Sequence, residues 1–318
     1  MSRKQKSGGE AIREYGIFGV LVLTFVTAAV LEPNFLKIQN LTNILKQIIP
    51  FGIVACAETI LIVSGSIDLA AGTTLALAAC VGAKVLVVTN SVLLAFLGAI
   101  AIGMLVNLIS GLLVTRFKLP PFIATLAMMN VAQGAANLFT DGKTITNLDQ
   151  LRWLGQGRVF YIPIMAILFA AVLLLVYIIM KKTKFGLQMY AIGGNTKATV
   201  AAGINAGRQL LITFLLAGAL TGIAAMVTAS RMLAAQPTVG SGYEFDAITA
   251  TVVGGTAFSG GVGGVRAIVI GSLIIGIINN VLVLAGVNSS WQIIVKGLLI
   301  ALAVMLDLNT KKNGKTKG

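Results

Sequence analysis

Long apolar stretches without charge, separated by short polar segments, dominate the sequence. Seven of them hold no Asp, Glu, Lys or Arg, at residues 15–31, 85–115, 119–140, 159–180, 209–230, 247–265 and 267–295. A transmembrane helix needs about 20 consecutive, mostly apolar residues to cross the hydrocarbon core of a bilayer. The pattern therefore predicts an all-α, polytopic membrane protein.

We expect about ten transmembrane helices, near residues 15–31, 43–63, 70–89, 92–114, 121–139, 160–180, 209–230, 246–258, 267–287 and 292–307. The eighth helix is short for a full crossing. A short segment at membrane depth is tolerated only where its backbone is buried in protein or lines a cavity. The eighth helix is therefore a candidate for broken structure along a transport pathway.

Composition and charge support this class and suggest an orientation. Hydrophobic residues make up 57% of the chain and charged residues 11%, with a mean hydropathy of +0.94, so a soluble fold would lack the polar surface to cover itself. Four groups of Lys and Arg fall within residues 3–13, 116–118, 181–208 and 311–317. Ten crossings put all four on one side, which the positive-inside rule identifies as cytoplasmic.

The expected domains follow from this orientation. Residues 1–14 would form a basic cytoplasmic N-terminus, 15–307 the transmembrane domain and 308–318 a basic cytoplasmic tail, with the first span left uncleaved. The net charge of +14 is spread over these rims without a basic-aromatic module. We therefore expect contact with anionic lipid headgroups and not with nucleic acid.

The chain lacks the residues that common catalytic and metal sites require. It has no His, and its two cysteines, Cys56 and Cys80, both lie in apolar segments. Zinc sites, iron–sulfur ligand sets and Ser-His-Asp triads therefore cannot be assembled in the usual way. No G-x-x-x-x-G-K-[ST] motif occurs, so we expect no ATP bound by a Walker A loop of this chain.

Polar side chains within the spans are rare. Glu58 lies about five residues before the end of the second span, and Asp68 lies in the turn into the third. A carboxylate at this depth usually faces the bundle interior or water, although Asp68 can instead cap the third helix. Lys84 is expected to reach toward an interface, and Lys296 either to do the same or to pair internally.

Residues 181–208 form a cationic, glycine-punctuated segment between two charge-free spans. The composition of this segment suits a loop that binds a partner. Its small residues at 198–202 can form a short helix, while Gly193, Gly194 and Gly203 allow sharp bends into and out of it. Lys197 can pair with an acidic partner group or stay solvated.

A set of motifs occurs in order along nearly the whole chain, from about residue 33 to 307. They are PNFL at 33–36, GSIDL at 65–69, PPFIATL at 120–126, FG at 185–186, YAIGGN at 190–195, GIN at 203–205, VGGT at 253–256, SGG at 259–261, NN at 279–280 and KG at 296–297. On these motifs the chain resembles the permease subunits of bacterial ABC importers for monosaccharides, in the ribose, xylose and galactose branch.

The resemblance implies a type II ABC-importer-like permease in the bacterial inner membrane that is not itself an enzyme. It implies a second permease subunit, most simply in a homodimer, two ATPase domains that bind the ATP, an extracytoplasmic sugar-binding protein, and no cofactor or metal on this chain. The residues that would couple to the ATPase are Gly186, Ala191, Gly193, Gly194, Asn195, Lys197, Ala198, Ala201 and Gly203. Candidates for the translocation pathway are Glu58, Ser66, Asp68, Asn107, Phe122, Thr125, Asn279 and Asn280.

Three departures from the family pattern leave alternatives open. Glu58 stands where we expect methionine, Gln133 where arginine is common, and Val262 where the glycine-rich turn often has arginine. We hypothesise that Glu58 lines the pathway or pairs with a cation across the bundle. The alternatives are an ABC permease for branched-chain amino acids or nucleosides, and a proton-coupled secondary transporter that uses Glu58 and Asp68. An intramembrane enzyme lacks a plausible base and nucleophile.

Overall fold

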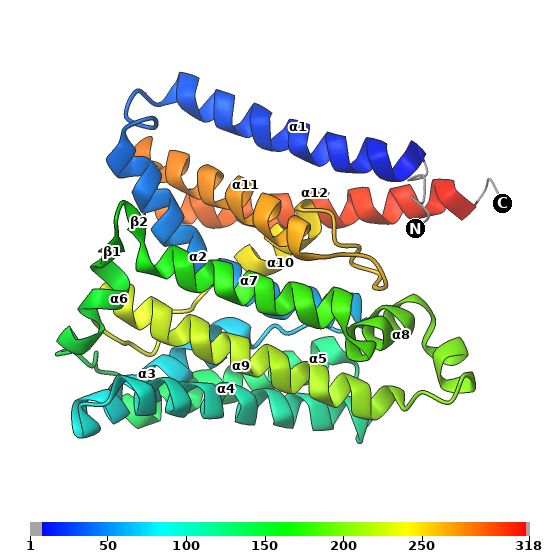
Figure 1. The fold of residues 1–318 in the computed structure, drawn as a ribbon, viewed down its shortest axis with the longest axis horizontal. Helices are drawn as coiled ribbons and strands as arrows, with labels where there is room; N and C mark the ends of the chain where they lie inside the picture. The colour runs from blue at the N-terminus through cyan, green and yellow to red at the C-terminus, as the bar shows by residue number, and fades with distance from the viewer. Residues whose placement is uncertain (1–7, 316–318) are drawn as a thin grey trace.

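Long helices run between two ends of the molecule and account for most of the described residues (Figure 1). The computed structural model describes residues 8–315. The long helices are α1 (Gly8–Leu31), α2 (Ile38–Val63), α3 (Ala71–Thr89), α4 (Val92–Thr115), α5 (Pro121–Thr140), α7 (Ile164–Lys182), α8 (Lys184–Ala201), α9 (Ala206–Met232), α11 (Val265–Leu284) and α12 (Ser289–Lys315). The short elements are η1 (Asp149–Leu151), α6 (Arg152–Gln156), β1 (Arg158–Val159), β2 (Ile162–Pro163) and α10 (Tyr243–Val253).

Each of the ten expected spans falls on a helix. Among the described residues, seven helices are long and apolar enough to cross a membrane, namely α2, α3, α4, α5, α7, α9 and α11, and shorter apolar stretches occupy 16–31 in α1 and 289–302 in α12. A multi-pass helical membrane protein is thus confirmed, whereas the count of ten crossings is not. Helix α10 has 11 residues, about 16 Å, which is roughly half of the hydrocarbon thickness.

The sixth and eighth expected spans run four or five residues beyond the helices that the structure has. The sixth was expected from residue 160, but residues 158–163 form an antiparallel hairpin and the helix begins at Ile164, after Pro163. The eighth was expected to reach residue 258, but α10 ends at Val253. Gly254 and Gly255 follow, and Gly255 has φ +106°, a conformation that ends a helix and that glycine adopts without strain.

Helix α9 lies at the centre of the bundle and packs against α2, α3 and α4. Glycines allow the closest of these contacts: a Cβ atom at Gly103 of α4 would collide with the Gly218 carbonyl of α9. Gly271 of α11 lies in the same way against Ala250 of α10. Small residues at such crossings let helix backbones approach, which is a main source of association between helices in a bilayer.

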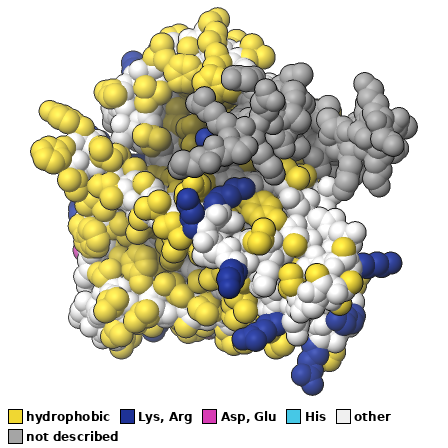
Figure 2. Space-filling view, turned by 45° about the vertical axis from the view of Figure 1, so that its right-hand side comes forward, with side chains coloured by type: hydrophobic (Ala, Val, Ile, Leu, Met, Phe, Trp, Pro, Cys, Tyr) yellow, Lys and Arg dark blue, Asp and Glu magenta, His cyan; other side chains and the backbone are white. Residues whose placement is uncertain are grey.

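One end of the molecule carries α8, the start of α1 and the end of α12 (Figure 1). Helix α4 also ends here, as its contact with α9 shows: Gly111, in the last two turns of α4, lies against Leu211 and Phe214 near the start of α9. Figure 2 turns this end forward and shows exposed Lys and Arg side chains on it. Residues 1–7 of the expected basic N-terminus and 316–318 of the tail lie outside the described residues.

Candidate functional site

Helix α8 contains a sharp bend that divides it in two. Asn195 has non-helical dihedral angles, φ −158° and ψ 94°, between helical residues 184–194 and 196–201. The Asn195 side-chain oxygen accepts a hydrogen bond from the Ala198 backbone N–H at 3.0 Å, so Asn195 acts as an N-cap for the second piece. Gly203, at φ +84°, ends it. The short helix that the sequence predicted is present.

Residues 194–203, which we call the docking segment, project from the molecule. All of them are exposed except Thr199, which is buried and bonds the Asn195 carbonyl at 2.8 Å. Of the residues expected to couple to an ATPase, those in this exposed stretch are Gly194, Asn195, Lys197, Ala198, Ala201 and Gly203. A segment of small side chains with one cation is thus available to a partner protein.

The other expected coupling residues lie against the bundle. Gly186 is buried, and Ala191 and Gly193 are partly buried. A Cβ atom at Gly193 would collide with the Val63 carbonyl at the end of α2. The bend that we expected at Gly193 and Gly194 lies instead at Asn195, and the missing side chain of Gly193 allows close packing against α2.

A second group of polar residues is buried inside the same half of the bundle. Glu58 of α2 is fully buried, and its Oε2 atom faces the Asp68 backbone N–H at 3.4 Å. The Asp68 carboxylate accepts a hydrogen bond from the Ala70 N–H at 2.8 Å, just before α3 begins at Ala71. Asp68 therefore stabilises the turn into α3 without being its N-cap. Asn107 of α4 is fully buried, and its side chain faces Asp68.

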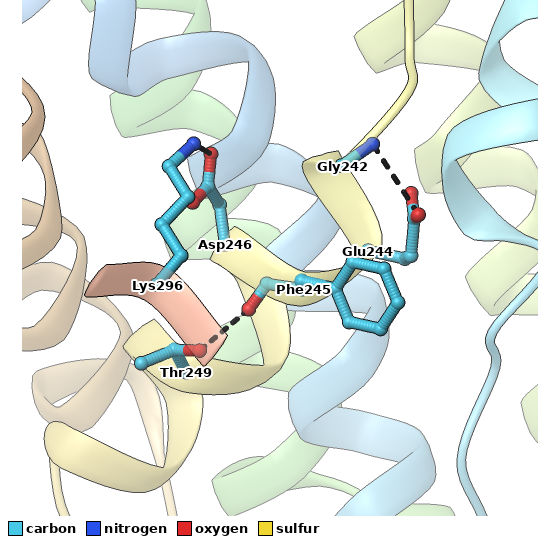
Figure 3. A network of polar contacts seen from close by, with 6 residues as sticks. All are labelled: Gly242, Glu244, Phe245, Asp246, Thr249 and Lys296. Carbon is cyan, nitrogen blue, oxygen red and sulfur yellow. Dashed lines mark hydrogen bonds and ion pairs between the residues drawn. The ribbon is translucent and has the colours of Figure 1, made fainter. Parts of the chain in front are cut away.

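Helix α10 adds two carboxylates that the sequence reading did not single out (Figure 3). Glu244 and Asp246 lie in its first turn and are buried. Carboxylates are favoured there because the helix N-terminus carries partial positive charge. Two acidic residues within four positions of Gly242, which has φ +87°, were the signal that marked this helix start.

The two carboxylates of α10 have different surroundings. Asp246 forms an ion pair with Lys296 of α12, with the Nζ and Oδ2 atoms 2.9 Å apart (Figure 3). Lys296 thus pairs internally, one of its two expected roles. Glu244 accepts a hydrogen bond from Gly242 N–H at 3.3 Å, and its other oxygen lies against Gly72 at the start of α3.

Glu58, Asp68, Asn107 and Glu244, which we call the polar centre, therefore come from α2, the turn before α3, α4 and α10. Glu58 lies within electrostatic range of both Asp68 and Glu244. No cation pairs with Glu58 among the described residues, so one half of our hypothesis for this residue is not supported. Several buried oxygen atoms of the described residues have no hydrogen-bond partner, among them Glu58 Oε1, Ser66 Oγ, Asn107 Oδ1 and Glu244 Oε2.

These unpaired atoms determine what the polar centre can do. Burying a polar group without a partner costs free energy, so each oxygen is an available contact for a hydroxylated solute, for water or for a proton. Ser66 is buried beside Asp68 in the chain and belongs to the same region. The polar centre therefore contains three of the predicted pathway residues, Glu58, Asp68 and Asn107, and Ser66 adjoins it.

The remaining pathway candidates lie elsewhere. Phe122 is 56% exposed on α5, and Thr125 is buried and bonds the Pro121 carbonyl of its own helix at 2.9 Å. Asn280 forms reciprocal amide hydrogen bonds with Asn40 of α2, at 2.9 and 3.0 Å. This pair ties α11 to α2, the default role that we expected for such an asparagine. Asn279 is partly buried.

Known proteins resemble this chain over nearly its full length. Residues 40–304 match the family model described as the permease component of the branched-chain amino acid transport system. Ribose import permease protein RbsC of Bacillus subtilis (strain 168) is 40% identical over 299 residues, covering 93% of each chain. RbsC of Escherichia coli (strain K12) is 37% identical over 301 residues, 93% of this chain and 94% of that protein.

A further relative is named for the import of galactose. Galactose/methyl galactoside import permease protein MglC of Escherichia coli (strain K12) is 36% identical over 319 residues, covering 93% of this chain and 94% of that protein. A search of the solved structures found no match. With a family model covering most of its length and relatives that it matches almost end to end, the chain belongs to this family of transport permease components.

Proposed function

We propose that this protein is the transmembrane subunit of a bacterial ABC importer for a monosaccharide, a pentose or a hexose. The observation that carries the proposal is its end-to-end similarity to permeases named for ribose and galactose import. The family model is described by branched-chain amino acid transport. Relatives that match almost end to end at 36–40% identity are closer evidence of substrate class than the description of a family model, so a sugar is favoured.

The transport machinery requires partners. Two permease subunits, in the simplest case two copies of this chain, would bind two ATPase domains on the cytoplasmic side and a sugar-binding protein on the other. The docking segment suits contact with the ATPase because its small side chains can enter a groove, and Lys197 is placed to meet an acidic group there. ATP would bind to the partner, and this chain would need no cofactor and catalyse no reaction.

The polar centre supports a role in passage of the solute. Its unpaired oxygens are hydrogen-bond acceptors that sugar hydroxyls can donate to, and they lie where α3 and the half-length α10 begin. Such broken helices within a bundle are typical of transport sites. ATP binding would change the contacts of the docking segment and shift the permease between outward- and inward-facing states, since a switch needs contacts that differ between two states.

The exposed cations support an orientation in the inner membrane. The end that carries α8 also carries Lys181, Lys182, Lys184 and Arg208, all exposed. By the positive-inside rule, this end would face the cytoplasm, together with the start of α1 and the end of α12.

The test is uptake of radiolabelled ribose, arabinose, galactose and leucine into proteoliposomes that contain the permease, its ATPase and its binding protein. We expect ATP-dependent uptake of at least one sugar and none of leucine. An ATPase variant that binds but does not hydrolyse ATP is the control.

Each other outcome contradicts a stated part of the proposal. Uptake of leucine instead of a sugar would replace the substrate class while keeping the transporter class. Uptake that persists without ATP and collapses with an uncoupler would favour the proton-coupled alternative.

A further inference from the structure

The glycine-rich loop between α10 and α11, residues 254–264, lies directly against α8. A Cβ atom at Gly261 would lie 2.9 Å from the Gly194 backbone, and one at Gly260 would lie 2.9 Å from the Gly193 carbonyl. Both Gly260 and Gly261 have positive φ angles, +85° and +76°. The contact is therefore made by backbone against backbone, and it sits just before the bend that starts the docking segment.

The same loop is bonded to the end of α2. The Gly261 N–H donates a hydrogen bond to the Val63 carbonyl at 2.9 Å. Val63 is the last residue of α2, and its carbonyl also lies against Gly193 of α8. The Val63 carbonyl thus lies where α2, α8 and the 254–264 loop meet, and we call this place the junction.

A tyrosine holds this junction from the side of α8. The Tyr190 hydroxyl donates a hydrogen bond to the Gly263 carbonyl at 2.8 Å, across 73 positions of sequence. The Lys181 Nζ atom lies 4.4 Å from the centre of the Tyr190 ring, where a cation is attracted by the ring face. Lys181 lies in the last turn of α7 and is exposed, so this contact holds the ring from the surface side of the junction.

The junction leads to the polar centre along two short paths. Glu58 lies five positions before Val63 on α2, about 7–8 Å along the helix. The loop follows α10 directly, and α10 carries Glu244 and Asp246. A displacement of α8 would therefore reach Glu58 through the last turns of α2, and the carboxylates of α10 through the 254–264 loop.

We propose that Tyr190 is a positioning residue that clamps the 254–264 loop and the end of α2 to α8, so that motion of the docking segment is transmitted to the polar centre. The proposal rests on the ABC importer function proposed above. It assigns to Tyr190, Gly193 and Lys181 a role in transmission, distinct from contact with the ATPase and from contact with the sugar.

The readout is the number of sugar molecules taken up per ATP hydrolysed, in proteoliposomes with the ATPase and the binding protein. For Tyr190→Phe, which removes only the hydroxyl, we expect ATP hydrolysis within about twofold of wild type and a fall of the sugar-to-ATP ratio of at least about fivefold. Tyr177→Phe, at a tyrosine of α7 that is 43% exposed, is the matched control and should keep the ratio. A merely structural role would lower hydrolysis and uptake together.

A second pair of variants keeps the test decisive if Tyr190→Phe does not fold. Lys181→Met removes the cation over the ring and should lower the ratio about twofold, whereas Lys182→Met, at the neighbouring exposed lysine, should not. An unchanged ratio in the folded variants overturns the clamp. Absence of ATP-driven uptake in the wild type would instead overturn the transporter proposal itself.

Discussion

The docking segment and the polar centre differ in both exposure and composition. The docking segment is exposed, built from small side chains and bent at a single asparagine. The polar centre is buried, consists of three carboxylates and one amide, and is packed against glycines of neighbouring elements. The docking segment can exchange one contact partner for another without disturbing the bundle, whereas the polar centre cannot. The difference separates surface recognition from buried contacts, so mutations in the two regions should fail in different ways.

The largest effect is expected from Gly72→Ala. A Cβ atom at Gly72 would collide with the Glu244 carboxylate and the Gly240 carbonyl, so we expect a destabilisation of about 3 kcal/mol, at the upper end of overpacking costs. This loss of stability is measured by thermal unfolding in detergent, with size-exclusion chromatography as the readout of the folded fraction. Gly134→Ala is the control, because a Cβ there meets nothing within 4 Å. Equal unfolding temperatures would show that the polar centre is not tightly enclosed.

Ala198→Trp should separate function from folding. Ala198 is exposed in the docking segment, so the larger side chain leaves the bundle intact while blocking a groove on the partner. We expect ATP-dependent uptake to fall at least about tenfold, with the unfolding temperature within a few degrees of wild type. Leu187→Trp, at an exposed position outside the docking segment, should keep uptake. Normal uptake by the Ala198 variant would remove the coupling role.

Lys296→Met tests the ion pair that borders the polar centre. The variant leaves the Asp246 carboxylate, 6% exposed, without its cation. Breaking a buried pair costs about 3–5 kcal/mol, and because Lys296 is partly exposed we expect roughly 2 kcal/mol. Adding Asp246→Asn should recover most of that loss. If the double variant is no more stable than the single one, the pair is not what stabilises α10 against α12.

The smallest effect is expected from Glu58→Gln, which keeps the volume of the side chain. Because the Glu58 Oε1 atom has no hydrogen-bond partner among the described residues, the change in stability should stay within about 1 kcal/mol. Uptake should fall a few-fold if Glu58 lines the pathway. Normal uptake, stability and pH dependence together would remove Glu58 from it.

The hydrophobic pattern predicted the fold class and the place of every long helix except α8, because a membrane span is recognised from its own length and composition. The pattern could not predict that α2, α10 and the 254–264 loop meet, since those contacts join residues nearly 200 positions apart, such as Val63 and Gly261. Glu244 and Asp246 were overlooked because they adjoin an apolar run without standing inside it. Gly193 was read as a bend, and only the structure reveals the Val63 carbonyl against it.

Helix α2 is hydrogen-bonded to other elements near both of its ends, so a displacement at one end would tilt the whole helix. Asn40 is tied to Asn280 at one end, and Val63 meets the junction with α8 at the other. The 23 positions between Asn40 and Val63 span about 35 Å, so a displacement of about 3 Å at Val63 would tilt the helix by only about 5°. Pro50 lies between the two fastenings, and because it lacks an N–H to donate, the axis can bend there at low cost.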